Sequence, residues 1–195
     1  MIKPDIEKSY VVGDFKFINY IHLNKEQKLE VLNSRNQEIV REKMYKSGAI
    51  SIEDQFQFID GLVNHTDRSY WYIEYCGEYV GSYNITDYNE FDNSCESGVF
   101  FRYTDLVHMD QNIKMLKKAY DFSFNEMNIN IMNGYTKASN LFMVNLILYF
   151  GFRQKSYSDI GYISVEMTKS DYIKKMRDRQ FSMRDFIKYI KITKS

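Results

Sequence analysis

The chain has 195 residues, 44% hydrophobic and 27% charged, which is the composition of one globular domain and not of a disordered protein. Its 26 basic residues balance 26 acidic ones, and this zero net charge argues against a dedicated nucleic-acid binder. No run approaches the roughly eighteen apolar residues of a membrane span. The first residues lack the basic-then-apolar design of a signal peptide. With two cysteines there is no disulfide framework, so we expect a cytoplasmic protein.

Apolar spacing predicts the elements of the first third of the chain. Residues 15–21 alternate and suit a half-buried strand. Asn24, with Gln27 three residues later, predicts the capped start of a short helix, and Ser51 predicts the start of another. Residues 34–48, between these helices, have no clear period. We expect them to form a helix and loop over a cleft.

The middle of the chain reads as a strand meander. Residues 70–75 and 78–86 predict an antiparallel hairpin, because Cys76-Gly77 supplies a tight turn between them. A polar loop over residues 87–93 follows. Residues 94–101 then predict a further strand.

The second half alternates helices with strands and ends in a helical tail. Apolar residues at helical spacing predict a long amphipathic helix through residues 113–127. The expected elements after it are a strand at 129–135, a buried helix at 141–150, a strand at 162–167, and helices at 171–179 and 183–190. This order predicts a mixed sheet with helices on both faces.

We expect residues 1–168 to form the main domain and residues 169–195 to form a basic helical extension packed on it. The extension carries nine Lys and Arg against three Asp. Two interpretations of this local charge remain open. The extension contacts phosphates, or its charges lie on a solvated helix face.

Three local patterns, in this order along the chain, carry a resemblance to a known family. The patterns are Arg35-Asn36 followed by Val40, Met44, Ile52, Glu53 and Phe58; Cys95-Glu96-Ser97-Gly98-Val99-Phe100; and Asn140 with Gly151-Phe152. By these patterns the chain resembles the Gcn5-related N-acetyltransferase (GNAT) superfamily over residues 15–167. Within it, the chain is most similar to the branch of ribosomal-protein and aminosugar N-acetyltransferases, which includes the 4-amino-sugar enzymes of pseudaminic-acid synthesis.

The resemblance implies an α/β fold (an α+β mixed sheet): the GNAT acyl-CoA N-acyltransferase fold with a C-terminal helical extension. It implies acetyl-CoA as acyl donor, with its pantetheine arm paired to the strand edge at Val99, Phe100 and Phe101. The diphosphate is then expected on the N-terminus of the following helix, where free N–H groups favour anions. The implied cofactor-binding residues there are Asp110, Gln111 and Asn112, with Asn140 contacting the arm or capping its helix.

The sequence departs from the family pattern at two places. The loop before the diphosphate site, residues 102–112, contains no Gly and carries Asp105 and Asp110, whose charge opposes anion binding unless the side chains point away. Asn112 would tolerate a left-handed backbone in place of Gly. The family commonly has a Tyr seven residues after the Asn, as the acid for the leaving thiolate, and here this position is Ile147. Tyr149 is the alternative acid, although it lies about 200° further round a helix.

Several residue types suit the transfer of an acyl group to an amine. Glu96 is our candidate general base, and its alternative role is that of an ion-paired or solvent-facing strand residue. Arg35, Met44 and Tyr45 are candidates for binding the acceptor. Cys95 lacks a nearby His motif and is expected to be a small core residue. The three histidines show no ligand spacing, so we expect no metal site.

Three functions remain open at this point. The first is acetyl-CoA-dependent N-acetylation of a small primary amine, an amino sugar carried on a nucleotide. The second keeps the chemistry but has a protein N-terminus or another primary amine as acceptor; a protein acceptor needs an open groove, whereas a sugar needs a closed polar pocket. The third is a degenerate GNAT-fold protein that binds without transferring acyl groups. The expected partner is a small-molecule amine, with no nucleic acid or membrane, for a monomer or homodimer.

Overall fold

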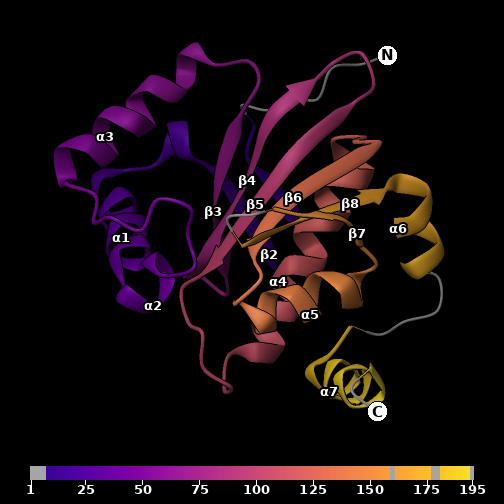
Figure 1. Cartoon of the computed structure of the whole chain (residues 1–195). Helices are drawn as coiled ribbons and strands as arrows, with labels where there is room; N and C mark the ends of the chain where they lie inside the picture. The colour runs from indigo at the N-terminus through magenta and orange to yellow at the C-terminus, as the bar shows by residue number, and fades with distance from the viewer. Residues whose placement is uncertain (1–7, 159–160, 177–180, 194–195) are drawn as a thin grey trace.

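An eight-stranded sheet separates two layers of helices (Figure 1). The computed structural model describes residues 8–158, 161–176 and 181–193. The strands lie in the order β1-β2-β3-β4-β5-β6-β8-β7, and neighbouring strands are antiparallel except for β5 and β6, which are parallel. The strands are β1 (Tyr10–Val12), β2 (Phe15–Asn19), β3 (Ser69–Tyr75), β4 (Glu78–Asn89), β5 (Ser94–Phe101), β6 (Ile131–Lys137), β7 (Arg153–Tyr157) and β8 (Tyr162–Thr168).

Seven α-helices in the described part of the chain cover the two faces of the sheet. They are α1 (Lys25–Asn36), α2 (Glu38–Arg41), α3 (Ile52–Gly61), α4 (Met109–Asp121), α5 (Leu141–Phe150), α6 (Lys169–Met176) and α7 (Met183–Thr193). A small core of buried apolar side chains lies under α1 and α3. The larger core lies on the opposite face, against α4 and α5. The predicted mixed sheet with helices on both faces is confirmed.

Local sequence signals explain where several elements begin and turn. Asn24 and Gln27 form the predicted capping box of α1, with hydrogen bonds in both directions. Ser51 caps α3 by accepting the N–H of Asp54. Cys76 and Gly77 both have positive φ, 53° and 83°, which is the backbone of a two-residue hairpin turn. The β3–β4 hairpin is therefore confirmed where the sequence placed it.

Other element bounds differ from the sequence prediction. The strand predicted over residues 15–21 ends at Asn19, because the Asn19 side chain accepts the N–H of Ile21 and opens a 3-10 turn. The loop predicted over residues 87–93 covers only residues 90–93, because β4 extends to Asn89. The long helix begins at Met109 and passes into a π-helical turn at Phe122–Glu126. Strands β1 and β7, which the sequence analysis missed, form the two edges of the sheet.

The parallel pair β5–β6 is short, and the two strands then diverge. Their register runs from Ser94 opposite Ile131 to Glu96 opposite Asn133, and it stops there. Beyond this point β5 continues on β4 alone, while β6 continues on β8. The sheet therefore opens into a V whose apex lies at Glu96.

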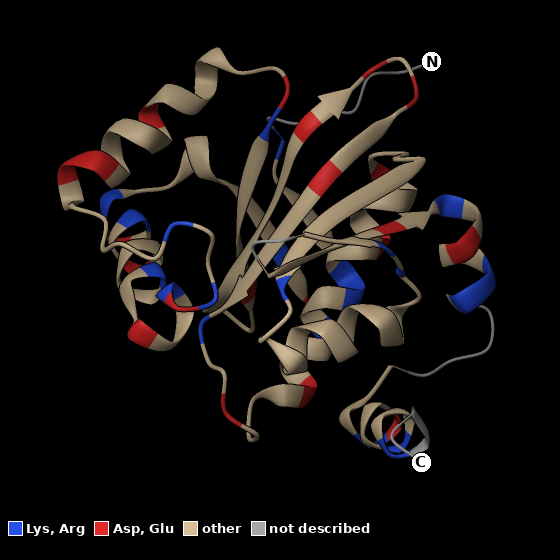
Figure 2. Cartoon of the chain, viewed as in Figure 1, with Lys and Arg blue, Asp and Glu red and all other residues tan. Residues whose placement is uncertain are grey.

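The C-terminal helices pack on the domain and share its core. Tyr172 of α6 and Phe186 of α7 are buried in the larger core, at 2% and 1% exposure. The predicted helix at residues 171–179 begins at Lys169, and residues 177–179 of that prediction lie outside the described part of the chain. Figure 2 shows basic residues interspersed with acidic ones on the outer faces of both helices. This arrangement favours the solvated-face interpretation of the local charge.

Candidate acyl-transfer site

A cavity of about 750 Å³ lies in the V between β5 and β6, within the usual size of small-molecule and cofactor sites. Its walls come from β5 on one side, β6 and β8 on the other, α4 and α5 beneath, and residues 39–45 above. Seven of the predicted site residues line it: Met44, Tyr45, Glu96, Val99, Phe100, Phe101 and Asn140. Five others, Arg35, Asp110, Gln111, Asn112 and Tyr149, do not.

The diverging part of β5 presents backbone groups to this cavity. Arg102 donates its N–H to the carbonyl of Val80 on β4. Because backbone groups along a strand point alternately to its two sides, those of Phe101, Val99 and Ser97 point away from β4, toward the V. Within the described part of the chain Val99 and Phe101 have no strand partner on that side, whereas Ser97 still contacts β6, where its hydroxyl donates to the carbonyl of Asn133 at 3.4 Å. An extended ligand with amide groups fits such an edge, because it can hydrogen-bond as a strand does.

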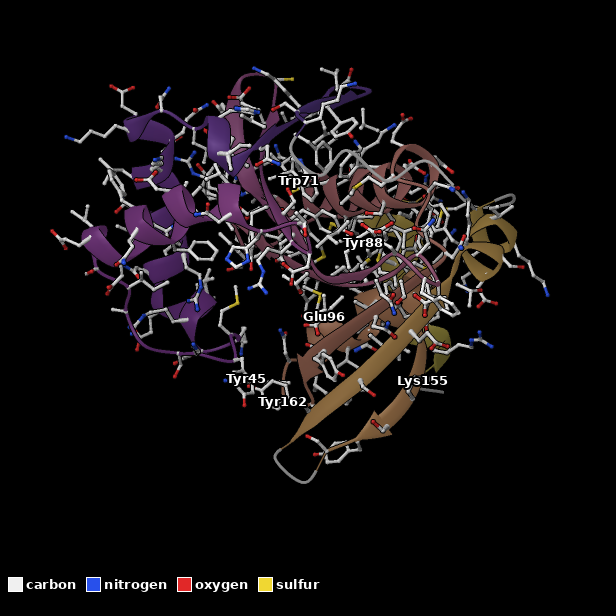
Figure 3. All side chains as sticks on the ribbon, turned by 90° about the horizontal axis from the view of Figure 1, so that it is seen from above. Tyr45, Trp71, Tyr88, Glu96, Lys155 and Tyr162 are labelled. Carbon is white, nitrogen blue, oxygen red and sulfur yellow. The ribbon has the colours of Figure 1, made fainter. Side chains whose placement is uncertain are left out.

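Glu96 stands at the apex of the V, where the two strands separate. Figure 3 shows it at the inner end of an open space that Tyr45 and Tyr162 border on the outer side. Burial raises the pKa of the Glu96 carboxyl, and the nearby Asp87 raises it further. Within the described residues no basic side chain forms an ion pair with Glu96. A half-buried carboxylate with a raised pKa and a cavity in front of it has the properties of a general base.

Asn84 is a cavity residue that the sequence analysis missed. It lies opposite Gly98 in the β4–β5 pair, and a Cβ on Gly98 would lie 2.6 Å from the Asn84 side-chain oxygen. The glycine therefore lets the amide of Asn84 lie across β5 beside Glu96. This pairing could not be found from spacing, because it depends on the register between two strands.

Hydroxyl groups gather on the β6–β8–β7 side of the cavity. Ser156 and Ser164 face each other across β7 and β8, with their hydroxyl oxygens 2.7 Å apart. Tyr135, Tyr162 and Ser158 line the same side. Glu96 is the one carboxylate among the cavity-lining residues that the structure describes. This end of the cavity is therefore polar but carries little charge.

The segment that follows α2 forms a roof over the polar end, as the sequence predicted. Lys137 of β6 reaches across and donates from Nζ to the carbonyl of Glu42, at 2.7 Å. The rings of Tyr45 and Tyr162 are in contact, with centroids 5.6 Å apart. These two contacts bridge the outer side of the cavity, which is partly enclosed and remains partly open to solvent.

Arg35 holds the roof from below and does not line the pocket. Its Nη2 donates to the carbonyl of Lys46 at 2.7 Å, and burial, with Arg41 nearby, lowers its pKa. Asn36 both donates to and accepts from the backbone of Ile50. The Arg35-Asn36 pattern thus shapes the loop, and the structure gives no direct contact that would support Arg35 as an acceptor-binding residue.

The Gly-free loop before α4 has a physical explanation. No residue of the segment 102–112 has a positive φ, so Gly is not required by the backbone there. Asp105 is occupied by His108, accepting from its backbone N–H at 3.0 Å. Asn112 does not replace Gly in a left-handed position. It lies inside α4, where its side chain donates to the carbonyl of Tyr103 at 2.7 Å.

On α5 the residues separate into a pocket face and a core face. Asn140 caps the helix by accepting the N–H of Met143 and also lines the pocket. Ile147, seven residues after Asn140, lines the pocket too. The ring of Tyr149 instead packs among Phe181, Phe186 and Tyr189. This placement removes the geometric basis for Tyr149 as the catalytic acid.

Replacing Tyr149 with Phe is expected to leave kcat and KM unchanged, because the hydroxyl lies in the aromatic core and not in the pocket. Steady-state kinetics of Tyr149→Phe beside the unaltered protein would check this. A fall in kcat of tenfold or more with unchanged folding would restore Tyr149 as a catalytic residue.

Other candidate chemistries find little support. Burial raises the pKa of the Cys95 thiol to about 12, with a further contribution from Glu96, so the thiolate needed of a nucleophile is disfavoured. Within residues 8–158, 161–176 and 181–193, no group of three or more His, Cys, Asp or Glu is arranged to hold a metal ion. None of the helices in that part of the chain is both long and apolar enough to cross a bilayer.

Solved structures share this fold, although no family model matches the sequence. The spermidine N-acetyltransferase from Vibrio cholerae, in complex with CoA and spermine, has a TM-score of 0.72 at 13% identity, covering 83% of this chain and 99% of its own. The Campylobacter jejuni N-acetyltransferase PseH, in complex with acetyl coenzyme A, has a TM-score of 0.62 at 14% identity, covering 79% and 98%. At such identities the likeness shows the fold alone: a GNAT-like mixed sheet.

Proposed function

We propose that this protein transfers the acetyl group of acetyl-CoA to the primary amine of a small hydroxylated acceptor, an amino sugar carried on a nucleotide. The observation that carries the proposal is the V in the sheet. It opens a strand edge at Val99 and Phe101 directly beside Glu96, inside one pocket. Acetyl-CoA bound along this edge would therefore lie next to the Glu96 carboxylate.

The cofactor would lie along β5. Its pantetheine amides would pair with the backbone groups of Val99 and Phe101, as an added strand does. Its diphosphate would rest on the N–H groups of Asp110 and Gln111, which belong to the first turn of α4 and so lack partners within the helix. Two known structures of this fold hold CoA or acetyl-CoA, which supports a cofactor of this class.

The reaction is a direct acyl transfer. The amine nitrogen attacks the thioester carbonyl, the new C–N bond forms, and the C–S bond breaks as CoA leaves as a thiolate. Glu96 accepts the proton that the nitrogen loses, directly or through one water. Ile147 cannot supply a proton to the sulfur, so the thiolate leaves unassisted and is protonated from solvent. A thiol pKa near 8.5 makes this route accessible.

The polar end of the pocket favours a hydroxylated acceptor. Ser156, Ser158 and Ser164 offer both donors and acceptors of hydrogen bonds, as the hydroxyls of a sugar require. A polyamine carries several ammonium groups, whereas the described lining of the whole pocket provides one carboxylate, Glu96. A protein N-terminus needs an open groove, whereas the Tyr45–Tyr162 contact and Lys137 bridge and narrow this side.

One experiment separates these functions. Calorimetric titration with acetyl-CoA is expected to show binding, and no heat would refute the cofactor assignment. The protein is then incubated with acetyl-CoA and three acceptors in turn: a nucleotide-linked 4-amino sugar, spermidine and a short peptide with a free N-terminus. Mass spectrometry is expected to show acetylation of the sugar first. Acetylation of spermidine or the peptide alone would replace the acceptor, and binding without any product would indicate a non-catalytic member of the fold, as Ile147 suggests.

A further inference from the structure

The C-terminal helix α7 contacts α4 and α5, the two helices that lie beneath the pocket. Phe186, which is 1% exposed, meets the ring of Phe142 edge-on, with centroids 5.8 Å apart, and Phe142 lines the pocket. Phe181 stacks on Phe150 at 4.7 Å. The helix is therefore a fixed part of the domain beside the proposed cofactor site.

The first turn of α7 also binds the first turn of α4. The backbone N–H of Met183 donates to Oδ1 of Asp110, at 3.1 Å, although the two residues are 73 positions apart. The other carboxylate oxygen of Asp110 lies 2.8 Å from Nζ of Lys114. Both contacts, that of Lys114 first, lower the pKa of Asp110. The carboxylate is thus kept ionised and turned toward α7.

This contact answers the difficulty that an acidic residue poses at a diphosphate site. A free carboxylate at Asp110 would swing near the amides of its own turn and repel a diphosphate. Lys114 alone is a weak restraint, because its side chain is more than half exposed and flexible. The Met183 N–H is a backbone group on a packed helix, so its position is set by the fold.

We propose that α7 is part of the cofactor site, and that the Met183 N–H is a positioning group that holds the Asp110 carboxylate away from the diphosphate. The proposal rests on the proposed function, because it assumes that CoA binds at the start of α4. The C-terminal extension would then contribute to cofactor binding, through the hydrogen bond between the first turn of α7 and the first turn of α4.

Met183 offers a clean test, because it is the first residue of α7. Proline is well tolerated at that position, where it removes the N–H and keeps the helix. Met183→Ala is the matched control, since it shortens the side chain but keeps the N–H. Asp110→Asn, alone and combined with Met183→Pro, removes the charge that the N–H is proposed to restrain. Circular dichroism establishes that each variant is folded.

The affinities of these variants for CoA and for pantetheine, which lacks the diphosphate, are then measured by calorimetry. Met183→Pro is expected to weaken CoA binding roughly tenfold relative to Met183→Ala, and to leave pantetheine unchanged. In the Asp110→Asn background the same substitution should have no effect. Equal CoA affinities of the Pro and Ala variants would overturn the role of α7, as would a loss that persists without Asp110.

The two hypotheses fail in different ways. If the unaltered protein binds neither CoA nor pantetheine, the proposed function is wrong and the inference falls with it. If it binds CoA but Met183→Pro makes no difference, only the inference is wrong. NMR titration of the Asp110 carboxyl gives a readout without cofactor: its pKa should rise in Met183→Pro and stay low in Met183→Ala.

Discussion

Replacing Glu96 with Gln is expected to lower kcat/KM for the amine acceptor about 100-fold or more, because a general base contributes that much in typical enzymes. The substitution keeps the size of the side chain and removes its ability to accept a proton. Binding of acetyl-CoA should be unchanged, since the proposed cofactor contacts lie on Val99, Phe101 and α4. Steady-state kinetics and calorimetry on the same preparation measure the two quantities separately.

Glu166→Gln is the matched control. Glu166 belongs to β8, which β6 separates from β5; it is bound to Lys155, 3.2 Å away, and does not line the pocket. Its substitution should leave kcat/KM within about twofold of the original value. If Glu96→Gln is no more harmful than Glu166→Gln, the proton leaves the amine by another route and Glu96 is not the base.

The pH profile provides a second readout of the same residue. Burial and Asp87 raise the pKa of Glu96, so the active carboxylate form is lost as pH falls through that elevated value. Activity is therefore expected to rise with pH along this limb, and the limb should disappear in Glu96→Gln. If activity instead falls again at high pH, and this fall disappears when a tyrosine is replaced, that tyrosine is a general acid. Such a result would contradict the unassisted departure of the thiolate.

Substitution of Gly81 by Ala is expected to destabilise the protein by roughly 2–3 kcal/mol and to weaken cofactor binding with it. Gly81 has a φ of 156°, and a Cβ there would lie 2.5 Å from the carbonyl oxygen of Phe100 and 3.0 Å from Cε of Met115. The obstacle is backbone of β5, so the strand that forms the pocket edge must move. Urea denaturation measures the loss of stability.

Gly61→Ala serves as the counterpart. Gly61 ends α3 with an ordinary φ of −73°, and a Cβ there would meet nothing within 4 Å. Because Ala is the better helix former, this variant should be more stable by about 0.5 kcal/mol. If the two substitutions change the free energy of unfolding equally, β4 and β5 adjust easily at Gly81, and the edge of β5 is not rigid.

Much of the fold was predictable because strong local signals mark it. The capping residues Asn24 and Ser51, the turn at Cys76-Gly77 and the apolar run of α5 each determine a boundary or a turn by themselves. Strand β7 gave no such signal. All five of its residues are exposed, so they show no alternation of apolar and polar side chains, and only the pairing with β8 reveals them as a strand.

The site was predictable to the extent that it follows a single strand. Glu96 and the residues from Val99 to Phe101 share β5, and the structure brings all of them to one pocket. Asn84 and the serines of β7 and β8 reach it only through strand register, which no spacing in the sequence records. Asp110 was recognised as a difficulty, but its partner Met183 is distant in sequence and contributes a backbone N–H, which residue type does not specify.

The separation of β5 from β6 also restricts the shape of what can bind there. An ordinary edge strand lies at the outside of a sheet, where its unpaired backbone groups can pair with any extended peptide and so promote aggregation. Here the edge faces another strand across a narrowing gap, and a peptide inserted at about 4.8 Å from β5 would carry side chains into the walls. A slender chain of amides with few substituents avoids that collision. The geometry proposed to accept a cofactor arm is therefore also expected to exclude strands of other proteins.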